Sequence, residues 1–221
     1  MKFLRYLRNL LITLFILSIG SVLLFKYVPV PVTPLMLINS GKNIINGKSP
    51  KFSHEWVSIE NISPHLVAAV VASEDQLFYD HMGFDFKQIE NAIEERKQGK
   101  RKRGASTISQ QTAKNIFTTC SSTWLRKGAE AYFTLCIELL WSKERILEVY
   151  LNSIEMGTGV YGAEAAAQKH FNTTAEKLTR QQSALIAASL PNPHRYNAGK
   201  PSKYVQKRQK QILKQMRNMG H

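Results

Sequence analysis

The feature that most constrains this chain is an apolar run close to its N-terminus. Residues 10–25 contain no charged side chain, and three cations stand before them, Lys2, Arg5 and Arg8. Extended to Val28 the run has 19 residues, which as a helix would span about 28 Å, close to the thickness of the hydrocarbon core of a bilayer. The run therefore predicts one transmembrane helix over residues 10–28.

The flanks of this run indicate its orientation. Positive charges ahead of the span favour a cytoplasmic tail over residues 1–9, with the rest of the chain on the far side of the membrane. A cleaved signal peptide is the alternative. However, the run continues into Lys26-Tyr27-Val28-Pro29 and not into a cleavage site of small residues. The sequence therefore favours an uncleaved anchor.

The net charge of the chain limits the classes of molecule that it is expected to bind. The formal net charge is +14, with 30 Lys and Arg against 16 Asp and Glu, so the chain should be attracted to nucleic acid, phospholipid head groups or a phosphorylated substrate. No nucleic acid is expected outside the membrane, which leaves the last two. The basic run 97–103 is either a solvated loop or lies on anionic lipid. Two cysteines, Cys120 and Cys136, are too few for a disulfide framework, and two thiols are expected.

The remainder of the chain reads as a linker and one mainly helical domain. Residues 29–50 begin with three closely spaced prolines, Pro29, Pro31 and Pro34, and should form a stiff, membrane-proximal linker. Residues 51–221 suffice for one domain of ordinary size, with a short strand or hairpin within 52–62. Ser63-Pro64 is a typical helix start, and Asp85 with Gln88 resembles a capping box. Further helices are expected over 86–98, 107–116, 125–141, 143–151, 162–169, 175–190 and 202–219.

A first group of chemically active residues follows an apolar helical run, residues 66–72, that ends in two carboxylates. Glu74, Phe78 and His81 are spaced i, i+4, i+7 and would share one face if the helix continues. Partial burial can raise the pKa of a carboxylate such as Glu74, as a general base or acid requires. Phe78 would exclude water, and His81 would orient a neighbour. The alternative is a surface helix end with an ordinary Glu74–Asp75 pair.

A second group lies on a predicted helix that Thr107 and Gln110 would cap. Thr107, Gln111 and Lys114 share the i, i+4, i+7 spacing, and Asn115 stands beside Lys114. A helix N-terminus with hydroxyl groups and a lysine can hold phosphate oxygens. A solvated surface face is the alternative reading.

A third group is Arg126, Lys127 and Glu130. Arg126 and Glu130 are spaced i, i+4, which fits an exposed ion pair or a cationic pair for phosphate with a second carboxylate. Residues 131–141 are almost wholly apolar, so we expect this helix at the centre of the domain. Glu130 would then lie at the start of its buried part. No Cys and His set has zinc spacing, and no nucleophile elbow is present. The three groups together indicate glycosyl or phosphoryl chemistry on an anionic substrate beside a membrane.

Four motifs, in this order, resemble the peptidoglycan glycosyltransferases of family 51: E-D-Q-L-F-Y-D-H-M-G-F-D, G-A-S-T-I-S-Q-Q-T-A-K-N, R-K-G-A-E and K-E-R-I-L-E-V-Y-L-N. The resemblance covers residues 56–196. It implies a lysozyme-like helical domain in the bacterial inner (cytoplasmic) membrane, with the catalytic part periplasmic. It also implies a divalent cation, Mg²⁺ or Mn²⁺, and no organic cofactor. Since the sequence stops at His221, a monofunctional member without a transpeptidase domain is expected.

The reaction that this resemblance implies is the polymerisation of lipid II into β-1,4 glycan strands, with inversion and release of undecaprenyl pyrophosphate. Glu74 matches the general base. Glu130 matches a second essential carboxylate, and whether it holds a metal, a water or Arg126 is open. Lys114 would face the pyrophosphate. The residues that match substrate-binding positions are Asp75, Phe78, His81, Thr107, Gln111, Lys114, Asn115, Arg126, Lys127, Tyr150 and Asn152.

The residues by themselves offer a plainer reading of two of these positions. Tyr150 and Asn152 could be groups at the core edge whose polar atoms are satisfied by backbone. Two residues also depart from the family pattern: Ala105 stands where a second glycine is usual, and Thr112 takes a usually apolar place.

Two other functions stay open at this point. A lysozyme-like hydrolase or lytic transglycosylase would act on finished glycan, but it has no need of the pyrophosphate-binding cations Lys114, Arg126 and Lys127. A non-catalytic, membrane-tethered scaffold would bind anionic lipid or cell-wall components through its basic surface. The partners expected are lipid II, the lipid-linked glycan chain, membrane phospholipid and other cell-wall synthesis proteins, and no nucleic acid.

Overall fold

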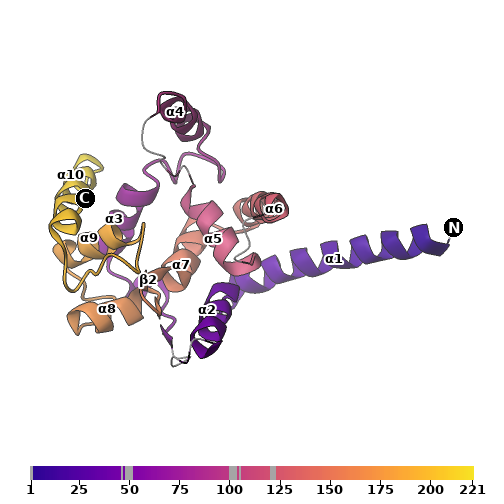
Figure 1. The fold of residues 1–221 in the computed structure, drawn as a ribbon, viewed down its shortest axis with the longest axis horizontal. Helices are drawn as coiled ribbons and strands as arrows, with labels where there is room; N and C mark the ends of the chain where they lie inside the picture. Colours follow the sequence, from indigo (N-terminus) through magenta and orange to yellow (C-terminus); the bar gives the residue numbers. More distant parts are fainter. Residues whose placement is uncertain (1, 46, 48–51, 100–103, 105, 120–122) are drawn as a thin grey trace.

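The chain is built mainly from α-helices, as the computed structural model shows for residues 2–45, 47, 52–99, 104, 106–119 and 123–221 (Figure 1). The helices are α1 (Lys2–Tyr27), α2 (Pro34–Ile45), α3 (Pro64–Glu74), α4 (Phe86–Lys97), α5 (Ile108–Phe117), α6 (Trp124–Leu140), α7 (Lys143–Ser153), α8 (Ala163–Phe171), α9 (Arg180–Ser189) and α10 (Lys203–Asn218), with a 3₁₀ turn, η1, at Ile59–Asn61. The predicted fold class, a mainly helical domain behind an apolar N-terminal helix, is confirmed.

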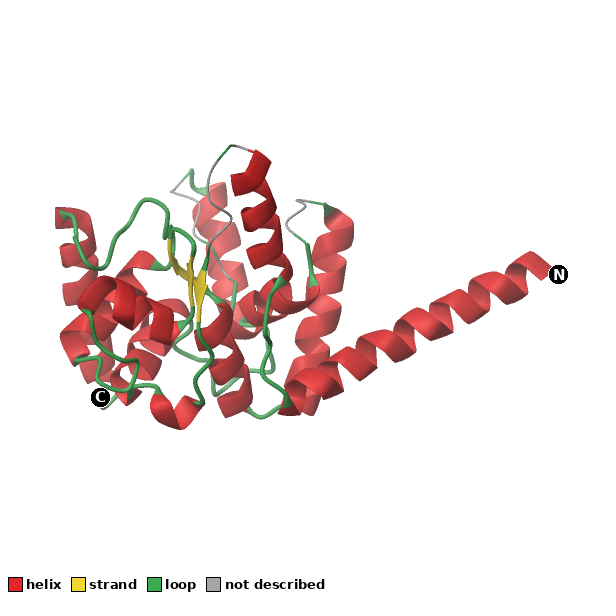
Figure 2. Ribbon diagram, turned by 90° about the horizontal axis from the view of Figure 1, so that it is seen from below, coloured by secondary structure: helices red, strands yellow, loops and turns green. Residues whose placement is uncertain are grey.

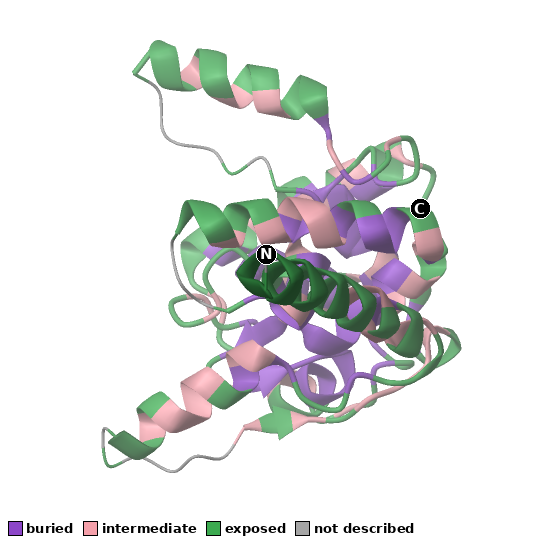
Figure 3. Cartoon of the chain, turned by 90° about the vertical axis from the view of Figure 1, so that its right-hand side faces the viewer, coloured by how far each residue is buried: buried purple, intermediate pink, exposed green. Residues whose placement is uncertain are grey.

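Helix α1 extends away from the domain (Figure 1). Seen nearly end-on, it is exposed over most of its surface, with the buried interior of the domain behind it (Figure 3). Among the described residues it is the one helix long and apolar enough to cross a membrane. An isolated helix that exposes so many large apolar side chains is suited to hydrocarbon and not to water.

The C-terminal end of α1 is fastened to the domain. The indole N–H of Trp141 donates to the carbonyl oxygen of Val22 at 2.9 Å. The Arg145 guanidinium donates to the carbonyls of Phe25 and Val28, both at 2.7 Å. Carbonyls in the last turn of a helix lack an intrahelical partner, so Arg145 caps α1 from another element. The direction of the anchor is therefore fixed relative to the domain.

The body of the domain consists of two groups of helices. Helices α3, α9 and α10 pack against one another, and α5 packs against α6 and α7. The largest side chains that are fully buried between them include Leu66, Phe78, Ile108, Ile146 and Tyr150. Helix α3 buries six of its eleven residues, and Glu74 at its C-terminal end accepts a hydrogen bond from Gln111 of α5.

A small three-stranded sheet joins distant parts of the chain (Figure 2). Its order is β1 (Ser53–His54), β3 (Val160–Tyr161) and β2 (Glu155–Gly157). Strand β1 pairs in parallel with β3, and β2 pairs antiparallel with an irregular register. We predicted only a short strand or hairpin within 52–62, so the part played by residues 155–161 was not anticipated.

The predicted starts of three helices are confirmed by their caps. Ser63 accepts a hydrogen bond from the His65 backbone, and Asp85 accepts one from the Gln88 backbone. Thr107 forms a complete capping box with the third residue of α5. These local signals set the helix boundaries because each side chain satisfies a backbone N–H that has no partner within its helix.

The expectation that one helix carries Glu74, Phe78 and His81 is wrong. Helix α3 ends at Glu74, and Asp75 leaves the helical conformation with φ −161°. Residues 76–80 form turns in which the Phe78 N–H donates to the Asp75 carbonyl at 3.1 Å. The chain turns here because the Asp75 carboxylate binds groups outside the helix. Phe78 and His81 are near Glu74 through this turn and not through helical periodicity.

Three further expectations need correction. Helix α9 begins at Arg180, because Thr179 caps it in a capping box with Gln182 that the predicted range of 175–190 overlooked. Helix α6 is not at the domain centre: Leu135 and Leu139 are 49% and 74% exposed. The predicted linker also contains the unanticipated helix α2, which begins at Pro34.

A glycine at the start of α8 generates a stability prediction. Gly162 has φ +85°, and a Cβ there would lie 2.7 Å from the Asn152 carbonyl oxygen. We expect Gly162→Ala to lower the free energy of unfolding by more than about 1 kcal/mol. Gly128→Ala is the control, since a Cβ there meets nothing within 4 Å and alanine should favour a helix interior by about 1 kcal/mol. Thermal unfolding in detergent measures both, and equal midpoints would contradict the assignment.

Candidate active site

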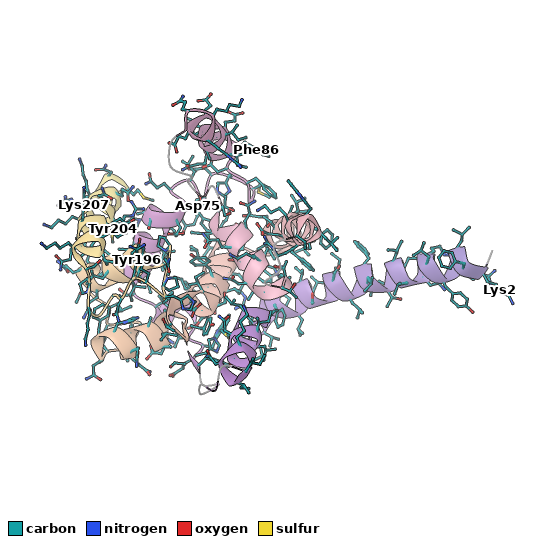
Figure 4. The ribbon with its side chains drawn as sticks, viewed as in Figure 1. Lys2, Asp75, Phe86, Tyr196, Tyr204 and Lys207 are labelled. Atoms are coloured by element: carbon teal, nitrogen blue, oxygen red, sulfur yellow. The ribbon has the colours of Figure 1, made fainter. Side chains whose placement is uncertain are left out.

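A cleft of about 760 Å³ opens at the C-terminal end of α3. The end of α3 contributes Glu74 and Asp75, the start of α5 contributes Thr107 and Gln111, and other lining residues come from α4 and α10. Four of the predicted site residues are therefore brought together in one cavity. Figure 4 shows Asp75 at the end of α3, between α4 and α10.

Glu74 is a partly buried carboxylate within this cleft. Its Oε2 accepts a hydrogen bond from Gln111 Nε2 at 3.1 Å, and its Oε1 accepts one from Ser73 Oγ at 3.4 Å. Burial raises the pKa of Glu74 above its ordinary value, against the opposing effect of these two hydrogen bonds and of the Arg208 charge. A carboxylate of this kind takes up a proton more readily than an exposed one.

Tyr150 fixes the direction of Gln111. Its hydroxyl group donates to Gln111 Oε1 at 3.2 Å. Burial, together with the charges of Glu74 and Asp75, raises the pKa of Tyr150 well above its ordinary value, so the hydroxyl keeps its proton. With its oxygen so engaged, Gln111 must present its NH₂ group to Glu74. Tyr150 is therefore satisfied by a side chain, and not by backbone as the plainer reading had it.

Asp75 and His81 form a buried pair beside Glu74. Asp75 accepts from His81 Nε2 at 2.9 Å and from the Ile108 backbone N–H at 3.0 Å. The Gly83 N–H donates to His81 Nδ1 at 3.1 Å. Burial lowers the pKa of His81, but the hydrogen bond and charge of Asp75 outweigh it, so the pKa is raised overall. Asp75 thus links the end of α3 to the start of α5.

A second buried cluster supports this turn and was not predicted. Phe78 is fully buried, and the Lys143 ammonium lies 4.5 Å from the centre of its ring. Lys143 Nζ also donates to the His81 carbonyl at 2.6 Å and to Glu138 Oε1 at 2.9 Å. Glu138 accepts a further hydrogen bond from Ser109. Phe78 is therefore a core residue behind the site, held in place by a buried ion pair.

The N-terminus of α5 is satisfied within the protein. Its first backbone N–H binds Asp75, and the Thr107 hydroxyl donates to the Gly83 carbonyl at 2.7 Å. Lys114 is exposed on the same helical face as Gln111. Asn115 is buried, and its Nδ2 has no hydrogen-bond partner in the part of the chain that the structure describes. Of the predicted phosphate site, Lys114 is the residue that is open to a ligand.

Glu130 is paired with the two cations that precede it. Its Oε2 accepts from Arg126 Nη1 at 2.9 Å, and its Oε1 accepts from Lys127 Nζ. The carboxylate is buried, whereas Lys127 is half exposed. Two cations against one carboxylate leave the start of α6 positively charged.

The residues at Glu130 do not fit a metal centre. Both carboxylate oxygens are engaged by cations. Within the described ranges, moreover, no group of three or more His, Cys, Asp or Glu side chains could hold a metal ion. Arg126, one of the partners considered for Glu130, is paired with it.

Asn152 is not part of the cleft. Its Oδ1 accepts from the Val57 N–H at 2.9 Å, and its Nδ2 donates to the Val57 carbonyl at 2.8 Å. This is the backbone-satisfied role that the plainer reading described. Thr112 is likewise satisfied, since its hydroxyl donates to the Ile108 carbonyl at 2.9 Å.

Of the two cysteines, the structure describes Cys136. Cys136 is a free, buried thiol. Cys120, Ala105 and residues 100–103 of the basic run lie outside the described residues.

One wall of the cleft was missed altogether. It is formed by Tyr204, Arg208, Gln211 and Gln215 of α10. The signal was present in the sequence, because these positions are spaced i, i+4, i+7, i+11 and so share one face of a helix. We predicted a helix over 202–219 but no site residue on it.

Comparisons with known proteins agree on one family. A family model described as transglycosylase matches residues 41–217. The chain is 60% identical to a biosynthetic peptidoglycan transglycosylase of Bacteroides thetaiotaomicron over 97% of its own length and 87% of that protein. It is 52% identical to a protein of the same name from Bdellovibrio bacteriovorus, over 90% and 80% of the two chains. A third, from Caulobacter vibrioides, is 48% identical over 95% and 91%.

The His81–Asp75 pair generates a prediction about pH. Because the folded-state pKa of His81 is raised above its ordinary value of about 6.5, protonated His81 stabilises the fold below that pH. This part of the stability is lost as the pH rises through the folded-state pKa. We therefore expect the difference in unfolding midpoint between wild type and His81→Gln to be largest near pH 6 and to shrink towards pH 9. A difference that grows with pH would contradict this pairing.

Proposed function

The chain belongs to the transglycosylase family, and on that premise we propose how its cleft works. The protein is a peptidoglycan glycosyltransferase that uses lipid II and the glycan chain as substrates. The observation that carries our proposal is Glu74, a carboxylate with a raised pKa that Gln111 and Ser73 hold at the cleft. The hydrolase and scaffold alternatives are set aside.

We propose that Glu74 is the general base of an inverting transfer. Its free lone pair takes the proton from the 4-hydroxyl group of the acceptor's N-acetylglucosamine. That oxygen attacks the anomeric carbon of the lipid-linked chain and forms the new β-1,4 bond. The bond from the anomeric carbon to the pyrophosphate breaks, and undecaprenyl pyrophosphate leaves with the bonding electrons. Attack from the face opposite an α-linked leaving group inverts the anomeric centre.

The leaving group is anionic, so it needs positive charge more than a protonated acid. Lys114 is exposed on the face of α5 that carries Gln111. Arg126 and Lys127 outnumber the single carboxylate with which they pair. We propose that these three cations bind the pyrophosphate. A divalent cation, Mg²⁺ or Mn²⁺, would in this proposal arrive with the pyrophosphate and not be held by Glu130.

The anchor and the family indicate a membrane-anchored protein. We propose that the membrane is the bacterial inner membrane, with the N-terminus in the cytoplasm and the domain on the outer side, as the cations before the span favour. The exposed apolar residues Trp124 and Leu139 of α6, which lies beside α1, support contact with phospholipid. We also propose that the protein contacts other cell-wall synthesis proteins.

Removal of the base is the first test of this mechanism. We expect Glu74→Gln to lower the rate of glycan synthesis from labelled lipid II by at least about 100-fold. Glu60→Gln, which changes an exposed carboxylate in η1, is the matched control and should polymerise like the wild type. Products are separated on a gel after equal times. Glycan ladders of equal intensity from wild type and Glu74→Gln would show that another residue is the base.

Removal of a hydrogen-bond donor to Glu74 should change the pH profile. The bond from Gln111 lowers the pKa of Glu74, so Gln111→Ala should raise that pKa. Because the base acts when deprotonated, the acid limb of the rate profile should then move to higher pH. Gln181→Ala, at an exposed position of α9, is the control. An acid limb at the wild-type position in Gln111→Ala would mean that Gln111 does not tune the base.

A further inference from the structure

The C-terminal part of the chain is basic without any acidic residue. Residues 177–221 contain ten Lys and Arg and no Asp or Glu, so they carry +10 of the formal net charge of +14. Half of these cations are exposed on one side of α10, which we call the basic face: Lys203, Lys207, Lys210, Lys214 and Arg217. Their spacing of i, i+4, i+7, i+11 and i+14 aligns them in one row, over about 21 Å of helix.

The basic face is separate from the cleft. The cavity lining that the structure describes includes Tyr204 and other residues of α10, but no residue of the basic face. The buried side of α10, with Val205, Ile212 and Met216, packs into the domain, so the basic face points outward. Figure 4 shows Lys207 on the outer side of α10. The proposed mechanism gives these cations no role.

The surroundings of the basic face do not neutralise its charge. Within the described residues, none of its five cations forms an ion pair. Helix α10 packs against α3 and α9. Helix α9 contains no carboxylate, and the one carboxylate of α3 is Glu74, which lines the cleft. Like charges three and four residues apart on a helix repel one another, so an anion bound along the row would stabilise it.

The position of the basic face excludes the membrane that holds the anchor as its ligand. Figures 1 and 2 place α10 and α1 on opposite sides of the domain. With α1 in the bilayer, the domain therefore stands between this face and the phospholipid head groups. Salt screens exposed charges from one another beyond about 8 Å. The ligand of the basic face thus lies on the side of the domain that is farthest from the membrane.

The composition of the basic face favours a flexible polymer over a folded protein. Four of its five residues are lysines, which are depleted at the centres of protein interfaces, where aromatic side chains are enriched. Among the residues of α10, the one large apolar side chain that is exposed is Tyr204, and it belongs to the cleft. Lysine is a point charge on a flexible stem and needs no fixed geometry in its partner. A row of lysines therefore suits many weakly held carboxylates.

We propose that the basic face docks the domain on finished peptidoglycan, through the carboxylates of its stem peptides. A free peptide end is ionised at neutral pH, so the finished wall is an anionic polymer. The inference rests on the proposed function, because it takes the domain to lie on the outer side of the membrane, where the wall is. The anchor in the membrane and the basic face on the wall then hold the enzyme where new strands are added.

Sedimentation with purified peptidoglycan tests the docking apart from catalysis. The full chain in detergent is mixed, without lipid II, with sacculi that have been freed of bound protein, and the bound fraction gives the affinity. The α10 variant carries Lys207→Gln, Lys210→Gln and Lys214→Gln. We expect it to bind about tenfold more weakly than the wild type, because three exposed ion pairs are lost at about twofold each. Equal affinity of the α10 variant and the wild type would overturn the proposal.

A matched control removes the same charge from exposed positions of another helix. The α4 variant carries Lys87→Gln, Arg96→Gln and Lys97→Gln. It should bind sacculi like the wild type, and both variants should polymerise lipid II in detergent at the wild-type rate. Amidation of the carboxylates of the sacculi should weaken wild-type binding at least to the level of the α10 variant. An equal loss of binding in the α4 variant, or unchanged binding to amidated sacculi, would overturn the proposal.

Cross-linking in cells identifies the partner of the basic face. A carbodiimide joins a lysine amine to a carboxylate in contact with it as an amide, and takes up the water that is lost. After digestion of the glycan, residues 203–217 should carry stem-peptide fragments. Attachment to another protein in their place would overturn the proposal. Neither experiment depends on Glu74 as the base, and protease added to spheroplasts, which digests a domain on the outer side, separates an error in the location from an error in the docking.

Discussion

The Asp75 carboxylate is the contact on which the rest of the site depends. It accepts the first backbone N–H of α5 and the Nε2 proton of His81. A carboxylate at a helix N-terminus is favoured both by that hydrogen bond and by the helix dipole. Through this contact the end of α3 meets the start of α5, two segments 33 residues apart in the chain. Glu74, the neighbour of Asp75, is thereby placed opposite Gln111.

Around this contact, buried and partly buried polar side chains bind one another. Tyr150 sets Gln111, and Gln111 binds Glu74. Lys143 holds the His81 carbonyl and pairs with Glu138. Such networks specify one arrangement when every member is satisfied, because an unpaired buried polar group is costly. Two opposing effects set the pKa of Glu74. Burial favours its neutral form, and the hydrogen-bond donors favour its charged form. That balance suits a group that must take up a proton in each cycle.

Much of the local structure could be predicted from the sequence, because helix starts depend on neighbouring residues. The caps at Ser63, Asp85 and Thr107 are of this kind. The partial burial of Glu74 also followed from the apolar run before it. The turn after Glu74 could not be predicted in this way, because it depends on a contact to the start of α5. The expectation that α6 lies at the domain centre failed for a related reason. An apolar run in the sequence packs equally well against a core or a bilayer, so it does not show which of the two the helix faces.

Chemical rescue distinguishes a base at Glu74 from any other role of that carboxylate. Glu74→Gly removes the carboxylate and leaves room for a small anion, and formate can then be supplied in solution. If Glu74 is the base, the folded Glu74→Gly variant has no polymerase activity, and formate restores the synthesis of β-1,4 glycan from lipid II in proportion to its concentration. A folded Glu74→Gly variant that makes glycan without formate, or that formate cannot restore, would show that Glu74 is not the base.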